Sequence, residues 1–192
     1  ILSLDLGHRQ VLPSERCSGQ QVKESCMDII FKRRSIRRFT NQEVGADLVT
    51  KVLAAAMAAP SAGNQQPWHF IVVKDKQGRQ MVSGCGPYAK AAADAPVAIV
   101  LCADLSLEKH QGFWVQDCSA AVENMLLEVC SLGLGAVWLG VYPREDRIKY
   151  LQKYFSLPDN IVPFAVIPVG YPAQELPPAD RYNQARIHCE KW

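Results

Sequence analysis

The residues best suited to bind an anion form the segment RRSIRR at positions 33–38, where four arginines flank one serine. Arg33 and Arg37 are four positions apart, so they lie on one side of a helix and also on one side of a strand. Ser35 joins them only if the segment is extended. The planar guanidinium group matches phosphate oxygens through two parallel hydrogen bonds. The spacing therefore predicts a site for the phosphate group of a small molecule.

An arginine-rich segment can also be a solvated surface or a nucleic-acid contact. The 192 residues carry a formal net charge of only +2, because acidic residues elsewhere balance the arginines. Domains that bind nucleic acids usually show a large basic excess spread over one face. The distribution therefore favours a small anionic ligand over a nucleic acid. A non-enzymatic module that binds anions or nucleic acid stays open as an alternative.

The sequence contains none of the common glycine-rich phosphate loops. It has no G-x-G-x-x-G after an apolar run, no G-x-x-x-x-G-K-[ST] and no Gly-x-Ser-x-Gly. Its four histidines and seven cysteines lack the spacing of metal ligands, so we expect no metal site. A phosphate would therefore be held by side chains.

Helical spacing of apolar residues and short apolar runs predict the elements that position these groups. Strands at 70–73 and 96–102 are expected to be buried on both faces, and Pro163 and Pro168 to restrict the ladder of the last strand. The wide apolar stripe on the longest helix fits either a subunit interface or the centre of one monomer. The expected helices cover residues 27–32, 48–57, 78–84, 87–95, 113–132 and 144–155, and the expected strands cover residues 70–73, 96–102, 136–141 and 162–169.

Length and composition are those of one globular domain. Residues 1–26 show no clear periodicity, so we interpret them as an N-terminal extension, which could be foreign to the native protein, and expect the folded domain to cover residues 27–192. The odd number of scattered cysteines favours free thiols in a reducing compartment. No apolar run is long enough to span a bilayer, and the first residues do not read as a secretory signal. We therefore expect a cytoplasmic protein with no membrane partner.

Three motifs occur in order along the chain. They are the arginine segment 33–37, the stretch 60–70 (PSAGNQQPWHF) after a helix, and the stretch 132–140 (LGLGAVWLG). Together they resemble the FMN-dependent nitroreductase family, whose members are NAD(P)H:FMN oxidoreductase-like. The resemblance covers about residue 27 to the C-terminus. It implies an α+β fold with a central, mostly antiparallel sheet flanked by helices, in an intertwined homodimer with an extended C-terminal arm.

The resemblance also implies roles for individual residues. Arg34 is expected to reach the ribityl chain or the pyrimidine edge of the flavin, or to face solvent. No side chain is expected to act as a catalytic acid or base, and His69 and Asp117 are interpreted as structural. The implied cofactor-binding residues are Arg33, Ser35, Arg37 and Arg181 at the phosphate, Pro60, Ser61, Ala62 and Asn64 from the other subunit, and Trp138, Leu139 and Gly140 along the flavin ring.

The implied activity is an FMN-dependent oxidoreductase that uses NADH or NADPH to reduce nitroaromatics, quinones or similar small-molecule acceptors. Donor and acceptor would occupy the same pocket in turn, in a ping-pong hydride transfer, which explains why no separate dinucleotide-binding fold is needed. A specialised flavin reaction on the same fold, such as reductive dehalogenation or reduction of an unsaturated bond, stays open as an alternative.

Overall fold

The computed structural model of the protein describes residues 26–192. The predicted extension at residues 1–26 therefore lies outside the described residues, apart from Cys26, which begins the first helix. The helices are α1 (Cys26–Lys32), α2 (Ala46–Met57), α3 (Lys76–Ser83), α4 (Ala91–Asp94), α5 (Trp114–Ser131) and α6 (Glu145–Phe155), with short 3-10 turns at Ala62–Asn64, Leu105–Leu107 and Gln184–Arg186. The strands are β1 (Trp68–Val73), β2 (Val97–Asp104), β3 (Gly135–Ala136), β4 (Leu139–Gly140) and β5 (Ile161–Gly170).

The strands form one antiparallel sheet in the order β1-β2-β5-β3, and β4 also pairs with β5. The two long central strands are apolar runs, and seven of the eight residues of β2 are buried. Pro163 in β5 lies opposite Cys102, where the register between β2 and β5 shifts. Proline has no N–H to donate to the ladder, so this irregularity is the restriction that the sequence predicts.

Two expectations about strands are wrong. β1 is not buried on both faces: it is an edge strand paired only with β2 among the described residues, and Val72 is 36% exposed. The expected strand at 136–141 is divided into β3 and β4, which keep a common register along β5. Apolar content alone does not report the number of neighbours that a strand has, and sheet position decides its burial.

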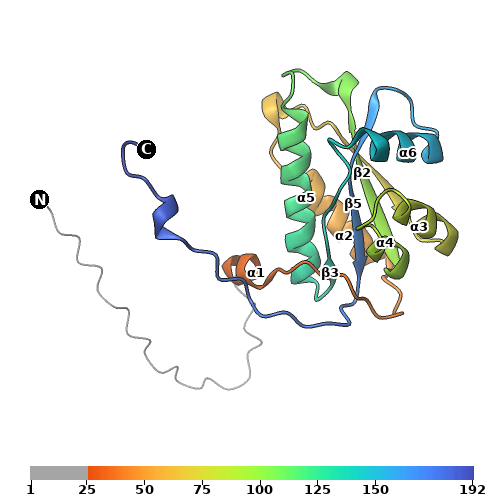
Figure 1. Ribbon diagram of the computed structural model, residues 1–192, viewed down its shortest axis with the longest axis horizontal. Coiled ribbons are helices and arrows are strands. Elements are labelled where there is room, and N and C mark those ends of the chain that lie inside the picture. The colour runs from red at the N-terminus through yellow and green to blue at the C-terminus, as the bar shows by residue number, and fades with distance from the viewer. Residues whose placement is uncertain (1–25) are drawn as a thin grey trace, which may run out of the picture.

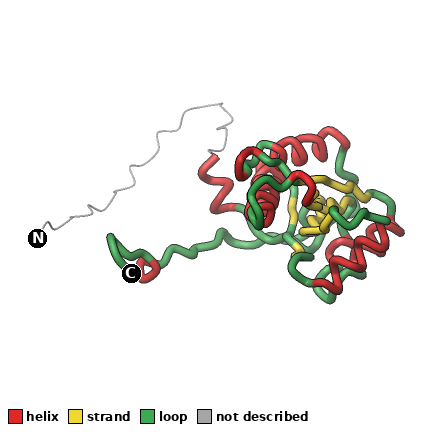
Figure 2. The backbone as a smooth tube through the Cα atoms, turned by 90° about the horizontal axis from the view of Figure 1, so that it is seen from above, coloured by secondary structure: helices red, strands yellow, loops and turns green. Residues whose placement is uncertain are grey.

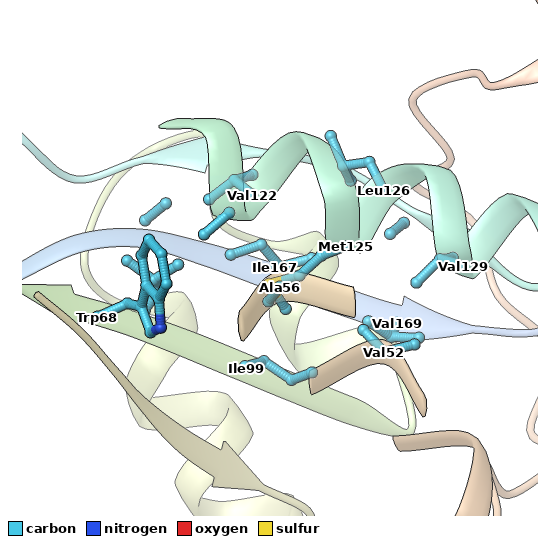
Figure 3. Packing of buried hydrophobic residues seen from close by; sticks show 14 of the residues in the cluster. Val52, Ala56, Trp68, Ile99, Val122, Met125, Leu126, Val129, Ile167 and Val169 are labelled. Atoms are coloured by element: carbon cyan, nitrogen blue, oxygen red, sulfur yellow. The ribbon is translucent and has the colours of Figure 1, made fainter. Parts of the chain in front are cut away.

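Helices cover both faces of the sheet (Figure 1). On one face, α2 and α5 pack against side chains of β2 and β5, including Ile99 and Ile167. Figure 3 shows this layer, in which Met125 of α5 points between the strands and α2. On the other face, α3, α4 and α6 cover the alternate side chains of the same strands, such as Val100 and Val166. The α+β fold with a mostly antiparallel sheet is therefore confirmed.

The segment that follows α1 runs alongside the sheet and meets the chain that leaves it. Ser35 forms a parallel bridge with Ala136, and the Ile36 amide donates to the Ala136 carbonyl at 2.8 Å. Phe39 pairs with Pro172 just after β5. From there the C-terminal segment passes near α1 and extends away from the helices and strands (Figures 1 and 2). Among residues 26–192, no helix combines the length and apolarity that crossing a bilayer requires.

Candidate functional site

The arginine segment lines a cavity of about 230 Å³. Arg33, Arg34, Ser35 and Arg37 contribute from the segment, and Arg181 contributes from the C-terminal tail together with Leu176. The bridge between Ser35 and Ala136 keeps this part of the chain extended, which is the condition for Ser35 to join the arginines. No carboxylate is among the residues that line this cavity. The structure thus brings together the four residues that the resemblance associates with the phosphate, and Arg34 lines the same cavity.

Arg33 is oriented by a carboxylate on the long helix. Its Nε lies 3.3 Å from Oε1 of Glu123 in α5, and that carboxylate side chain is 46% exposed. Because the ion pair uses Nε, the two terminal nitrogens of the guanidinium remain as donors for a ligand. Arg37 in turn donates from Nη1 to the Ser35 carbonyl at 3.4 Å. These contacts restrict the directions in which the two guanidinium groups point.

A second cavity, of about 260 Å³, shares Arg37 with the first. One wall is the predicted ring-binding segment, with Trp138, Leu139 and Gly140. Trp138 is supported from behind by Phe164 of β5, with ring centroids 5.8 Å apart. Arg37 therefore stands between a strongly cationic cavity and one with an aromatic and aliphatic wall. An elongated ligand with a phosphate at one end and a flat ring at the other matches this arrangement.

The rest of the lining of the second cavity comes from residues that sequence reasoning missed. They are Cys85, Gly86, Tyr88 and Ala89 between α3 and α4, and Arg147 in α6. The glycines and Pro87 of this connection were a signal for an irregular turn, but no local pattern distinguishes Arg147 from an ordinary helix-surface cation. Burial raises the pKa of the Cys85 thiol, and the nearby Arg147 charge partly opposes that rise.

Arg147 is held in place by two backbone contacts. Its Nη1 donates to the Gly140 carbonyl at 2.7 Å. Its guanidinium also lies against Gly86, where an added Cβ would be only 2.9 Å from Nε. Gly86 therefore leaves room for the side chain that crosses it.

The loop at residues 60–66 is built by a different kind of network. Asp117, at the start of α5 and only 4% exposed, accepts from the Ala62 amide at 2.9 Å and from the Gln65 side chain at 2.6 Å. Oε1 of the Gln65 side chain accepts from the backbone amides of Lys109 and His110. Asp117 thus has the structural role that the sequence interpretation assigns to it.

The structure does not place this loop beside the arginine cavity of the same chain. The loop is attached through Asp117 near the first turn of α5, whereas Arg33 meets Glu123 farther along, and α1, which leads into the arginine segment, lies beside the other half of α5 (Figure 1). Asp117 and Glu123 are six positions apart, which is about 9 Å along the helix. None of Pro60, Ser61, Ala62 and Asn64 lines the arginine cavity of the same chain. Ser61 is also engaged locally, because its hydroxyl accepts from the Gln66 amide at 3.1 Å.

The pair formed by His69 and Asp104 lines neither cavity. Nε2 of His69 is 3.8 Å from Oδ2 of Asp104, where β1 pairs with β2. The Ser106 hydroxyl and the Asn160 amide donate to Asp104, and these hydrogen bonds lower the pKa of its carboxyl group, the Ser106 bond most. The acceptor capacity of Asp104 is therefore directed at loop groups, which fits the structural interpretation of His69.

Comparison with known proteins agrees with this geometry. A sequence model described as "Nitroreductase family" matches residues 30–84 and 82–171. A Methanothermobacter thermautotrophicus protein named "Putative NADH dehydrogenase/NAD(P)H nitroreductase" is 49% identical over 174 residues, which are 91% of each chain.

Solved structures show the same fold. The chain is similar to a Clostridium acetobutylicum structure described as a "Putative NADH Oxidase", with a TM-score of 0.84 and 50% identity over 86% of this chain and all of that one. It is also similar to an "FMN-dependent Nitroreductase" from Clostridium difficile, with a TM-score of 0.81 and 29% identity over 86% of this chain and 99% of the other.

Proposed function

This chain belongs to the nitroreductase family, and on that premise we propose that it is an FMN-dependent oxidoreductase that takes electrons from NADH or NADPH. The observation that carries the proposal is the pair of cavities that meet at Arg37, one lined by arginines and the other by Trp138 and Leu139. Their chemistry matches the two ends of FMN, a phosphate and a flat ring. Membership of an oxidoreductase family also favours an enzyme over a simple anion-binding module.

The arginine cavity fits a phosphate group. A phosphate monoester carries about −1.5 to −2 charges near neutral pH, and the lining residues supply four guanidinium groups and one hydroxyl without a competing carboxylate. Each charge-assisted hydrogen bond contributes roughly 1.5–3 kcal/mol. Three such bonds give on the order of 5–9 kcal/mol before ordering costs. Micromolar binding requires about 8 kcal/mol, so burial of the ring has to contribute as well.

Trp138, Leu139 and Gly140 would supply that burial along the ring. Leu139 is buried and Trp138 is half-buried, so the apolar wall already exists before a ligand binds. Backbone groups of the same segment can hydrogen-bond to the polar rim of the ring. Arg34 lines the phosphate cavity, which places it with the phosphate and ribityl end under this proposal.

We assign the loop with Pro60, Ser61, Ala62 and Asn64 to a second copy of the chain, in a homodimer that completes the site. Two observations support this assignment. The loop does not line the arginine cavity of its own chain, yet the buried Asp117 holds its backbone in a defined shape. Large apolar side chains near α1 are also strongly exposed in one chain, with Phe31 at 60%. Burial of such groups against a partner would be favourable.

A bound FMN would supply the redox chemistry, as the group that takes a hydride from the nicotinamide and passes electrons to the second substrate. The protein's contribution is to bind and orient, because neither His69 nor Asp117 has a free group aimed into the two cavities. Donor and acceptor would use the space beside the ring in turn. Nitroaromatics and quinones are flat and fit a site between a ring and the loop of a partner subunit. We assign this chemistry to the cytoplasm.

The purified full chain tests the proposal directly. We expect a yellow protein whose flavin absorbance bleaches on addition of NADH or NADPH without oxygen and returns on addition of a quinone. Sedimentation should show a dimer. A colourless protein that does not retain added FMN would refute the proposed function.

A further inference from the structure

The second cavity, called the ring cavity below, is lined by the positively charged side chain of Arg147, whose charge neither a phosphate ligand nor the fold neutralises. Arg37 and Arg147 both line it, and no acidic residue does. Arg37 also faces the phosphate cavity, so its charge has a ligand under the proposed function. Arg147 does not line that cavity. Its charge therefore belongs to the ring end alone.

The position of Arg147 leaves its charge without a counter-ion in the described part of the chain. The side chain is half-buried, and no carboxylate of residues 29–192 lies within 4 Å of its nitrogens. Its hydrogen bond to the Gly140 carbonyl uses one of five N–H donors. A partly desolvated guanidinium group without an anion is unfavourable, unless a ligand supplies acceptors or negative charge. The remaining donors are thus suited to a ligand.

We propose that Arg147 is a cofactor-binding residue whose guanidinium group contacts the carbonyl edge of the flavin ring and stabilises reduced flavin relative to oxidised flavin. This inference rests on the proposed function. A flavin ring has an apolar rim with methyl groups and a pyrimidine rim with carbonyl oxygens. The carbonyl oxygens, which are the acceptors best suited to a guanidinium group, are all on the pyrimidine rim. Because the Arg147 guanidinium group lies at Gly140, the proposal places the pyrimidine rim on the α6 side of the cavity.

Charge explains why the two oxidation states should differ. Two-electron reduction of a flavin places negative charge on the pyrimidine part of the ring when the ring is not fully protonated. A fixed cation beside the pyrimidine rim favours that form through its charge. The oxidised ring is neutral and gains only a hydrogen bond. Removal of the charge should therefore weaken reduced FMN more than oxidised FMN.

The test compares Arg147→Met with Arg144→Met in the full-length dimer. Arg144 immediately precedes α6, is exposed and is not among the residues that line either cavity, so its substitution removes the same charge nearby without touching the ring. The dissociation constant of oxidised FMN is measured by fluorescence quenching. The midpoint potential is measured by equilibration with reference dyes. Together they give the affinity for reduced FMN.

We expect Arg147→Met to lower the ratio of reduced to oxidised FMN affinity by about tenfold, which corresponds to a drop of about 30 mV in a two-electron potential. Arg147→Lys keeps the charge and should retain most of the ratio, and Arg144→Met should leave it unchanged. If Arg147 only supports the backbone at Gly140, both affinities fall together and the potential stays constant. That result would overturn the inference.

Gly86→Ala gives a second test that leaves every charge in place. An added Cβ would be 2.9 Å from Nε and 3.1 Å from Cζ of Arg147, so the guanidinium has to move. We expect a shift of the potential in the same direction, smaller than that of Arg147→Met. A potential unchanged in both variants would contradict the inference. If the wild-type chain binds no FMN at all, the proposed function fails instead, and the two failures are therefore distinguishable.

Discussion

The loop at residues 60–66 and the arginine cavity are both polar, but they are stabilised in opposite ways. In the loop, Asp117 and Gln65 are buried and satisfied by partners within the chain. In the arginine cavity, four guanidinium groups gather with no carboxylate in the lining, and Glu123 meets Arg33 from outside it. The loop is complete without a ligand, and the cavity is complete only with an anion.

This difference indicates how the two regions divide the work. A satisfied buried network fixes backbone geometry, because every broken hydrogen bond would leave a desolvated group unpaired. A cluster of like charges is mutually repulsive without a ligand and favours the binding of an anion. Substitutions in the loop network should therefore change stability, and substitutions in the cavity should change ligand affinity. The following predictions test that division.

Asp117→Ala should have the largest effect. It removes the acceptor for both the Ala62 amide and the Gln65 side chain, so it should lower the free energy of unfolding by about 3 kcal/mol. Urea denaturation at a fixed protein concentration measures this. Asp159→Ala, at an exposed acid, is the control and should change stability by less than about 0.5 kcal/mol. Equal effects would show that the network does not stabilise the loop.

Arg33→Ala should act on binding and leave stability nearly unchanged. Loss of one charged phosphate contact should raise the dissociation constant of FMN by about thirtyfold, or about 2 kcal/mol. Its exposed ion pair with Glu123 should contribute less than about 1 kcal/mol to folding. Arg38→Ala is the matched control, because Arg38 does not line the phosphate cavity. Titration of both variants with FMN distinguishes them, and equal losses would contradict the assignment of this cavity to the phosphate.

Gly135→Ala should change both stability and FMN affinity, because it disturbs the strand pairing that holds the arginine segment. An added Cβ would lie 2.7 Å from Cγ2 of Ile36, the residue whose amide is bonded to Ala136. We expect the free energy of unfolding to fall by about 1–2 kcal/mol and the dissociation constant of FMN to rise. Ile36→Ala removes the crowded atoms, so Gly135→Ala should cost less in that background. Additive losses in a double-mutant cycle would exclude this contact as the cause.

Asp104→Asn should have the smallest effect, a change in how stability depends on pH under acidic conditions. The folded-state pKa of Asp104 is below its usual value because Ser106 and Asn160 donate to the carboxylate. The ionised form therefore contributes stability above the unfolded-state pKa of about 3.9, and this contribution is lost as pH falls through the folded value. Melting temperatures between about pH 6 and pH 2 should fall less steeply for the variant. An unchanged slope would show that these hydrogen bonds do not favour ionisation.

Local patterns predicted much of this fold because the relevant signals are short in range. The apolar runs of β2 and β5 and the helical spacing in α2 and α5 appear in the structure with ends shifted by a few residues. Gly133, just after α5, has a φ of 71°, the left-handed conformation in which glycine commonly ends a helix. β1 was misjudged because burial depends on its place at the sheet edge, which a run of apolar residues does not encode.

Sequence alone determined the charge and chemistry of the arginine cavity, because the types and spacing of Arg33, Ser35 and Arg37 are set within five consecutive positions. Tertiary structure decided the rest of the site. Arg181 reaches the same cavity from the tail, and Arg147 crosses Gly86 to meet Gly140. These segments are distant in the chain, and only the packing of helices on both faces of the sheet and the pairing of the strands brings them within contact distance.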